Sequence, residues 1–99
     1  MNPYADVYRL AARRIRTDGW CHHGGITPDG KVCLLIAIFM ASRERMEEDE
    51  IRLPAEAAAR YVSHGSAGTT ALIHWNEDEA RTQADILELL DELAEAKLG

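Results

Sequence analysis

"CLLIAIFMASRERM", residues 33–46, is the stretch that decides the fold of this 99-residue chain. Every residue from 33 to 41 is apolar, so the first two turns of a helix here have no polar face. A helix that is apolar all round is buried at the centre of a bundle. A buried strand over residues 32–39 is the competing interpretation. The length of the run and its alanine and methionine content favour the helix, which we predict over residues 33–46.

The segment before this helix also has helical periodicity. Apolar residues recur at spacings of three and four from Tyr4 to Ile15, which predicts one buried stripe. Asn2-Pro3 is typical of a helix start, and Asp18-Gly19 is typical of a helix end. We therefore expect a first helix that packs on the central one.

Helical signals continue in the second half of the chain. An alanine-rich stretch predicts a helix from Pro54 to His64, stopped by the small residues 65–68, after an acidic loop at residues 47–50. Residues 71–76 predict a short apolar element of one or two turns. Thr82-x-x-Asp85 resembles a capping box. It precedes a last helix whose apolar face comprises Ile86, Leu89, Leu90, Leu93 and Ala94.

Between the first two helices the chain is rich in turn signals. Gly24-Gly25 and Pro28-Asp29-Gly30 are typical of tight turns, and the segments around 25–27 and 31–32 can pair as a short hairpin. We predict one all-α domain over residues 1–99. It is a bundle of about four helices with a glycine-rich loop or short β-hairpin at residues 20–32.

The composition indicates a globular protein and excludes a membrane-spanning segment. The chain is 46% hydrophobic and 28% charged, which is ordinary for a globular domain. Its longest uncharged apolar run, residues 32–42, is about half the roughly twenty residues that a membrane span needs. The N-terminus has no secretory leader pattern. We expect a cytoplasmic protein without a membrane partner, in which the two cysteines are reduced.

Charge is distributed unevenly along the chain. The formal net charge is −6, but residues 1–17 carry a net +3 and residues 76–99 a net −6. The overall sign argues against nucleic-acid binding, which needs cations for phosphate. We expect the basic segment to face the acidic tail, in the same chain or in a partner copy. Arg9, Arg13 and Arg16 are the candidate interaction surface.

Residues 19–33 concentrate the reactive side chains. The candidate metal ligands of the chain are Cys21, His22, His23, Cys33, His64 and His74, but their spacing matches no known zinc finger. We keep a zinc site using Cys21, His23, Cys33 and His74 as an alternative, and expect no cofactor.

The same cysteines allow two other kinds of chemistry. A cysteine nucleophile with a nearby histidine is a second alternative, although so small a helical domain leaves little room for a substrate cleft. A disulfide between Cys21 and Cys33 fits a hairpin-like excursion, but not as a permanent bond in the cytoplasm. The simplest interpretation is structural: Cys33 is buried, Trp20 and Trp75 anchor loops, and Asn76 caps the turn before the last helix.

The order of these residues resembles a small domain family of unknown function from actinobacteria and their phages. The similar features are Gly19-Trp20-Cys21, then Asp29-Gly30-Lys31-Val32-Cys33, then Trp75-Asn76 before Arg81-Thr82. The resemblance implies a small cytoplasmic protein encoded by a phage, and it brings no activity with it. It also implies that Trp20, Cys33, Trp75 and Asn76 form one structural cluster.

The combined prediction is a non-enzymatic protein-interaction module with no catalytic residues. Its partner is another protein, such as a host protein, or a second copy in a homodimer. The first alternative is a metal- or thiol-dependent protein that uses Cys21, His23 and Cys33. The second is a nucleic-acid-binding regulator that uses the basic first helix, although no helix-turn-helix pattern supports it.

Overall fold

The computed structural model describes residues 2–63 and 68–97, and these contain five α-helices and no β-strand. This confirms the all-α class and corrects the number of helices. The predicted short apolar element at residues 71–76 is a regular helix of two turns. The helices are α1 (Ala5–Asp18), α2 (Leu34–Arg45), α3 (Leu53–Ser63), α4 (Thr70–Glu77) and α5 (Gln83–Glu95), with a single 3-10 turn η1 (Glu48–Glu50) before α3.

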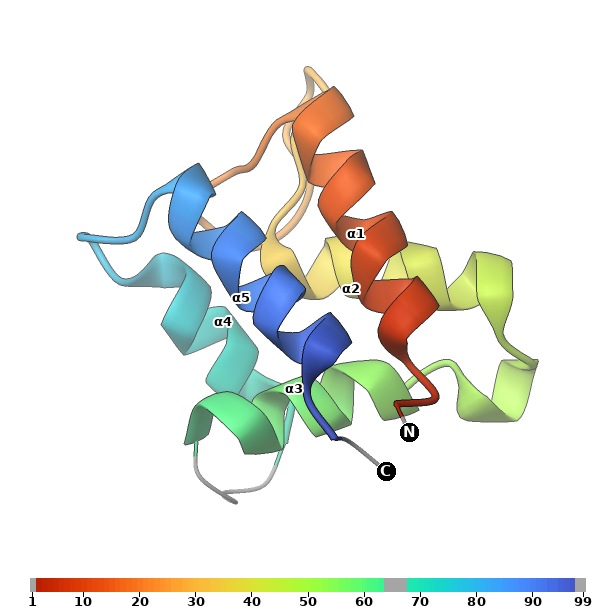
Figure 1. Cartoon of the computed structure of the whole chain (residues 1–99). Helices are drawn as coiled ribbons and strands as arrows, with labels where there is room; N and C mark the ends of the chain where they lie inside the picture. Colours follow the sequence, from red (N-terminus) through yellow and green to blue (C-terminus); the bar gives the residue numbers. More distant parts are fainter. Residues whose placement is uncertain (1, 64–67, 98–99) are drawn as a thin grey trace.

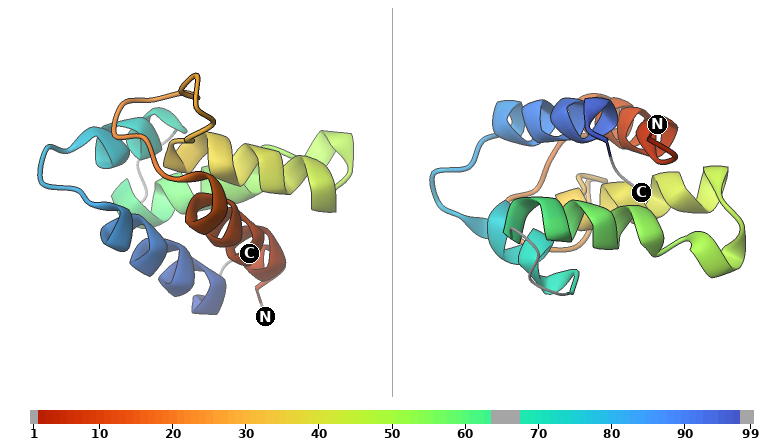
Figure 2. Two further views of the ribbon diagram at one scale, coloured as in Figure 1. Left: turned by 90° about the horizontal axis from the view of Figure 1, so that it is seen from above. Right: turned by 60° about the horizontal axis from the view of Figure 1, so that its bottom comes forward.

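The helices form two layers (Figures 1 and 2). α1 and α5 run antiparallel, side by side, and cover α2, α3 and α4. α2 packs against α1, α3 and α4, so it connects the layers as its composition predicts. Its burial is nevertheless one-sided. Leu34, Ala37, Ile38 and Ala41 are buried, whereas Leu35, Ile36, Phe39 and Met40 are only partly covered.

The layer of α1 and α5 is held by two apolar stripes. The buried residues of α5 are the five predicted from sequence. Those of α1 are Val7, Tyr8, Ala11, Ala12 and Ile15. The small alanines let the neighbouring helices approach closely, and the large side chains supply the apolar area whose burial stabilises the fold.

α1 starts at Ala5, later than expected, although Asn2 accepts a hydrogen bond from the backbone two residues on, as an N-cap does. Asn2 Oδ1 accepts from Tyr4 N at 3.0 Å, and Asn2 Nδ2 donates to the carbonyls of Leu93 and Ala94 at 2.5 and 3.2 Å. Asn2 therefore ties the start of the chain to the end of α5. The capping box of Thr82 and Asp85 is present as predicted.

The remaining predicted boundaries are close to the observed ones. α3 ends at Ser63, and the predicted stop at residues 65–67, like His64, lies outside the described residues. The acidic run 47–50 is exposed and contains the turn η1 rather than an irregular loop. None of the described helices has the length and apolar character required to cross a membrane.

Candidate functional site

The connection between α1 and α2, residues 19–33, is an ordered excursion beyond the helices (Figure 1); we call it the clamped loop. Gly19 begins it with φ +94°, a conformation that glycine adopts without strain, and its N–H donates to Ile15 O at 2.9 Å. The predicted hairpin is reduced to one antiparallel bridge between Ile26 and Val32. A parallel bridge joins Trp20 to Val32 where the loop closes.

Asn76 binds the clamped loop to α4 and is 1% exposed. Its Oδ1 accepts from Trp20 Nε1 at 2.7 Å and from Leu34 N at 2.9 Å. Its Nδ2 donates to the carbonyls of Cys21 and His22, at 3.2 and 2.8 Å. One carboxamide therefore satisfies four polar groups of the loop and of the α2 N-terminus. The expectation that Asn76 caps the turn before the last helix is wrong: it lies within α4 and reaches back to the loop.

Three further contacts fix the other edge of the clamped loop. Trp20 N donates to Gln83 Oε1 at 3.2 Å, and Gly24 N donates to Glu77 Oε2 at 3.2 Å. His22 Nε2 donates to the carbonyl of Asp78 at 2.6 Å. These partners lie at the end of α4 and the start of α5, so the loop is tied to the α4–α5 connection.

Trp75 lies beside Asn76 in the sequence but makes a different contact. The guanidinium of Arg81 lies 3.6 Å from the centroid of the Trp75 ring, and Arg81 Nε donates to Trp75 O at 2.9 Å. Arg81 also pairs with Asp78 at 3.8 Å. The structure thus joins Trp20 to Asn76 directly, whereas Trp75 stabilises the connection that leads into α5.

The four candidate metal ligands have different surroundings. Cys21 Sγ donates to the carbonyls of His23 and Gly25, at 3.1 and 3.3 Å, and burial raises the pKa of its thiol. Cys33 is 2% exposed at the α2 N-cap position. His74 is exposed on α4, and the exposed His23 ring stacks on His22. No group of three histidine, cysteine or acidic side chains in residues 2–63 and 68–97 is placed to hold a metal.

The candidate interaction residues share a groove of about 310 Å³ between α1 and α5. Arg9, Arg13 and Arg16 of α1 are spaced by four and three residues, so they follow one face of the helix. We call this hollow the arginine groove. Its other lining residues are Tyr8, Ala12, Leu87, Leu90 and Asp91.

Among the described residues, these three arginines form no ion pair within 4.0 Å. Arg14, on another face of α1, pairs with Asp18 at 3.5 Å and with Glu44 at 3.2 Å. The basic helix does pack on the acidic last helix as expected, but its arginines and the carboxylates of α5 are not paired. The groove therefore keeps a positive wall.

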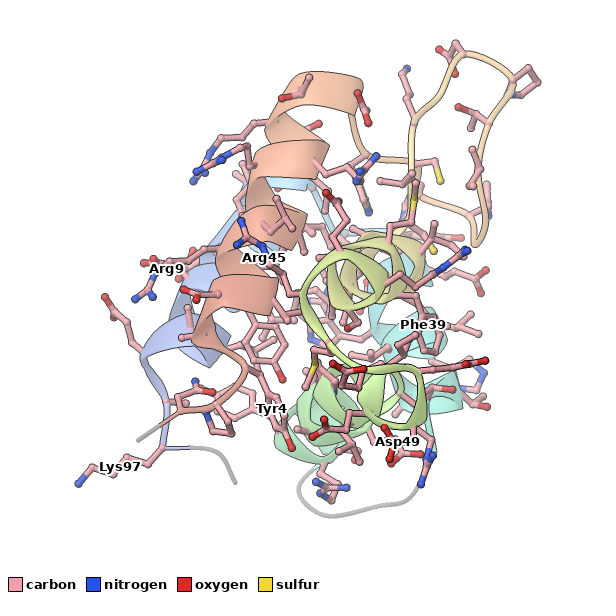
Figure 3. The ribbon with its side chains drawn as sticks, turned by 90° about the vertical axis from the view of Figure 1, so that its right-hand side faces the viewer. Tyr4, Arg9, Phe39, Arg45, Asp49 and Lys97 are labelled. Carbon is pink, nitrogen blue, oxygen red and sulfur yellow. The ribbon has the colours of Figure 1, made fainter. Side chains whose placement is uncertain are left out.

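Sequence reasoning missed one arginine beside the groove, Arg45, and named Arg81 only as part of the family resemblance. Arg45 ends α2 and joins Arg9 and Arg13 around a smaller adjoining hollow of about 190 Å³. Figure 3 shows Arg9 and Arg45 beside α1. Arg81 closes the α4–α5 connection. Nothing local in the sequence marks Arg45, because its neighbours in the hollow lie on α1. The partners of Arg81, Trp75 and Asp78, are close in sequence, but their contacts with it form only in the turn between α4 and α5.

A model of a family of unknown function, DUF6197, matches residues 1–96 of the chain. The chain belongs to this family. The DUF6197 match includes both the clamped loop and the arginine groove, so both lie in the family's domain. No curated protein matches the chain, and no solved structure does. DUF6197 membership supplies no activity, so function has to be argued from the two sites themselves.

Proposed function

We propose that this protein is a non-enzymatic cytoplasmic interaction module that binds an acidic segment of another protein in the arginine groove. The observation that carries the proposal is the wall of Arg9, Arg13 and Arg16, which have no carboxylate partner among the described residues. A host protein is the partner class that fits the expected phage origin.

The chemistry of arginine favours a carboxylate ligand. A guanidinium stays charged at all physiological pH values and presents several N–H donors that match a carboxylate in a bidentate pair. Three like charges on one helix face also repel one another. A ligand with carboxylates at similar spacing relieves that repulsion, which favours the bound state over the free groove.

The groove also has an apolar component. Leu87 of α5 is partly exposed beside the arginines, whereas Leu90 and Ala12 border the groove but are buried in the packing of α1 on α5. Its volume of about 310 Å³ is enough for one or two side chains of a partner. The fitting occupant is an acidic amphipathic helix that places a leucine-sized side chain on α5 and carboxylates against α1.

A protein partner fits this surface better than nucleic acid does. The chain has a net charge of −6, and Asp91 lies in the groove itself. A phosphate backbone is repelled by these carboxylates, and nucleic-acid affinity depends on cations exceeding them. The partly exposed Leu87 also offers no charge or hydrogen-bond donor to a phosphate backbone.

The test uses a fluorescein-labelled synthetic helical peptide with glutamates four residues apart and leucines between them. Fluorescence anisotropy measures its binding to the full chain at low salt. Since exposed ion pairs contribute about 0.2–1 kcal/mol each, R9Q/R13Q/R16Q is expected to weaken binding roughly tenfold. R43Q/R52Q/R60Q, which changes net charge equally outside the groove, is the matched control.

Three results would contradict the proposal. Equal loss in the two triple variants would mean nonspecific charge attraction. Equal or tighter binding of a DNA duplex would favour the nucleic-acid regulator. A concentration-dependent dimer that R9Q/R13Q/R16Q abolishes would make a second copy the occupant. Analytical ultracentrifugation of the wild-type chain distinguishes that last case.

A further inference from the structure

Cys21 and Cys33 lie on the two adjacent segments where the clamped loop closes, each one residue after the bridged pair Trp20 and Val32. Hydrogen bonds from Val32 N to Gly19 O (3.1 Å) and from Cys21 N to Val32 O (3.0 Å) form the parallel bridge of Trp20 with Val32. The backbones of bridged segments run about 4.8 Å apart, and Cys21 and Cys33 each directly follow one of the two bridged residues. The backbone pairing ends there, because Leu34 N and Cys21 O are bonded to Asn76 instead. This placement is compatible with the Cα separation of about 4.4–6.8 Å that a disulfide spans.

A shared hydrogen-bond acceptor supports this juxtaposition independently. Cys21 Sγ donates to Gly25 O at 3.3 Å, and the backbone N–H of Cys33 donates to the same oxygen at 3.1 Å. The sulfur of Cys21 is thus held beside the backbone of Cys33. Both cysteines are free thiols, 8% and 2% exposed respectively.

We propose that Cys21 and Cys33 are a redox-active cysteine pair. The two thiols reduce a low-molecular-weight disulfide, and a disulfide forms between Cys21 and Cys33 within the clamped loop. The proposal goes beyond the interaction function, because neither cysteine lines the arginine groove.

The exchange proceeds in two balanced steps. The Cys21 thiolate attacks one sulfur of the small disulfide, whose S–S bond breaks and releases one thiol after protonation. The Cys33 thiolate then attacks the Cys21 sulfur of the mixed disulfide and expels the second thiol. The protein loses two protons and two electrons, and the small disulfide gains both. Cys21 reacts first because it is 8% exposed against 2% for Cys33, and the reaction is faster at alkaline pH because burial raises the pKa of its thiol.

The bond has a structural consequence for the loop. It links residue 21 to the N-cap position of α2 and encloses the turn at Thr27–Gly30, whose ends are joined by Gly30 N to Thr27 O at 2.9 Å. The reduced loop opens when its hydrogen bonds break, whereas the oxidised loop stays closed. Oxidation is therefore expected to raise the unfolding temperature of the whole chain.

The test treats the reduced wild-type protein with oxidised glutathione and measures intact mass under denaturing conditions. We expect a product lighter by two hydrogens, with both cysteines protected from alkylation and a peptide map that links residues 21 and 33. Dithiothreitol should restore the starting mass. A stable glutathione adduct, a disulfide-linked dimer or no reaction would each overturn the proposal.

The single variants C21S and C33S are the matched controls, and they keep a side chain of similar size. C33S is expected to stop at the glutathione adduct on Cys21, while C21S should react at least tenfold more slowly. Because the wild-type measurement needs no substitution, the proposal stays testable even if a variant folds poorly. Peptide binding in the groove should be unchanged by oxidation, so failure of this proposal is separable from failure of the interaction function.

Discussion

Asn76 Oδ1 accepts a hydrogen bond of 2.7 Å from Trp20 Nε1, across 56 residues of sequence. The same oxygen accepts from the first amide of α2, and the amide nitrogen of Asn76 donates to two carbonyls of the clamped loop. A buried polar side chain is tolerated only when its groups are paired, and here all of them are. Asn76 is therefore the buried residue that makes the most hydrogen bonds to the loop.

We expect N76A to destabilise the fold by roughly 2–4 kcal/mol, because it leaves the buried groups of the loop and the α2 N-terminus without partners. Urea unfolding followed by circular dichroism measures the loss. Q83A removes a single exposed acceptor from Trp20 N and is the matched control, with an expected loss below about 1 kcal/mol. Similar losses in N76A and Q83A would show that Asn76 does not hold the loop.

The bond between Trp20 and Asn76 can be isolated with a double-mutant cycle. W20F keeps an aromatic ring and removes the Nε1 donor, so it should cost about 1 kcal/mol alone. In the N76A background the donor already lacks its acceptor, and W20F should then cost about 1 kcal/mol less. Strictly additive losses in urea unfolding would mean that the 2.7 Å contact does not couple the two residues.

The helix starts offer a second matched comparison. Thr82 accepts from Asp85 N at 3.3 Å in the capping box of α5, whereas Thr69 at the start of α4 makes no capping hydrogen bond. T82A should therefore destabilise the chain by about 1 kcal/mol, and T69A by much less. Thermal unfolding of both variants checks this, and equal shifts in Tm would contradict the assignment of the capping box.

The difference between these helix starts shows what sequence can predict. The capping box, the apolar face of α5 and the helical nature of α2 are local patterns, so they could be predicted from residues close together in the chain. The partners of Asn76 are not local. An asparagine next to a tryptophan is compatible with a residue that caps a turn. It is equally compatible with a buried side chain that bonds several backbone groups, and only the packing of α4 against the loop determines which role Asn76 has.

The arginine groove, too, could be predicted from the sequence only in part. Arg9, Arg13 and Arg16 were recognisable as one basic face, because helical spacing alone places them there. The groove exists because Leu87 and Leu90 lie beside them, and this depends on α1 and α5 being neighbours. Charge alone predicted that α1 faces the acidic tail, and α1 does pack on α5. The packing joins the two helices through buried apolar stripes, and no ion pair forms between their described residues.

Tyr8 links pH to stability through a buried hydrogen bond. Its hydroxyl donates to Pro54 O at 2.7 Å, which joins α1 to α3, and burial raises its pKa above the ordinary value of 10.0. A raised pKa means that the folded chain holds this proton more tightly than the unfolded chain does. The stabilisation is therefore complete below pH 10 and is lost as pH rises above it.

Y8F should cost about 1 kcal/mol at neutral pH, because Pro54 O loses its donor. Between pH 10 and 11.5 its stability should fall less steeply than that of the wild type, since the variant has no buried phenol to ionise. Urea unfolding at a series of pH values measures both effects, with Y61F as the control at a partly exposed ring. Parallel pH profiles for Y8F and the wild type would show that the buried hydroxyl of Tyr8 does not govern the alkaline loss.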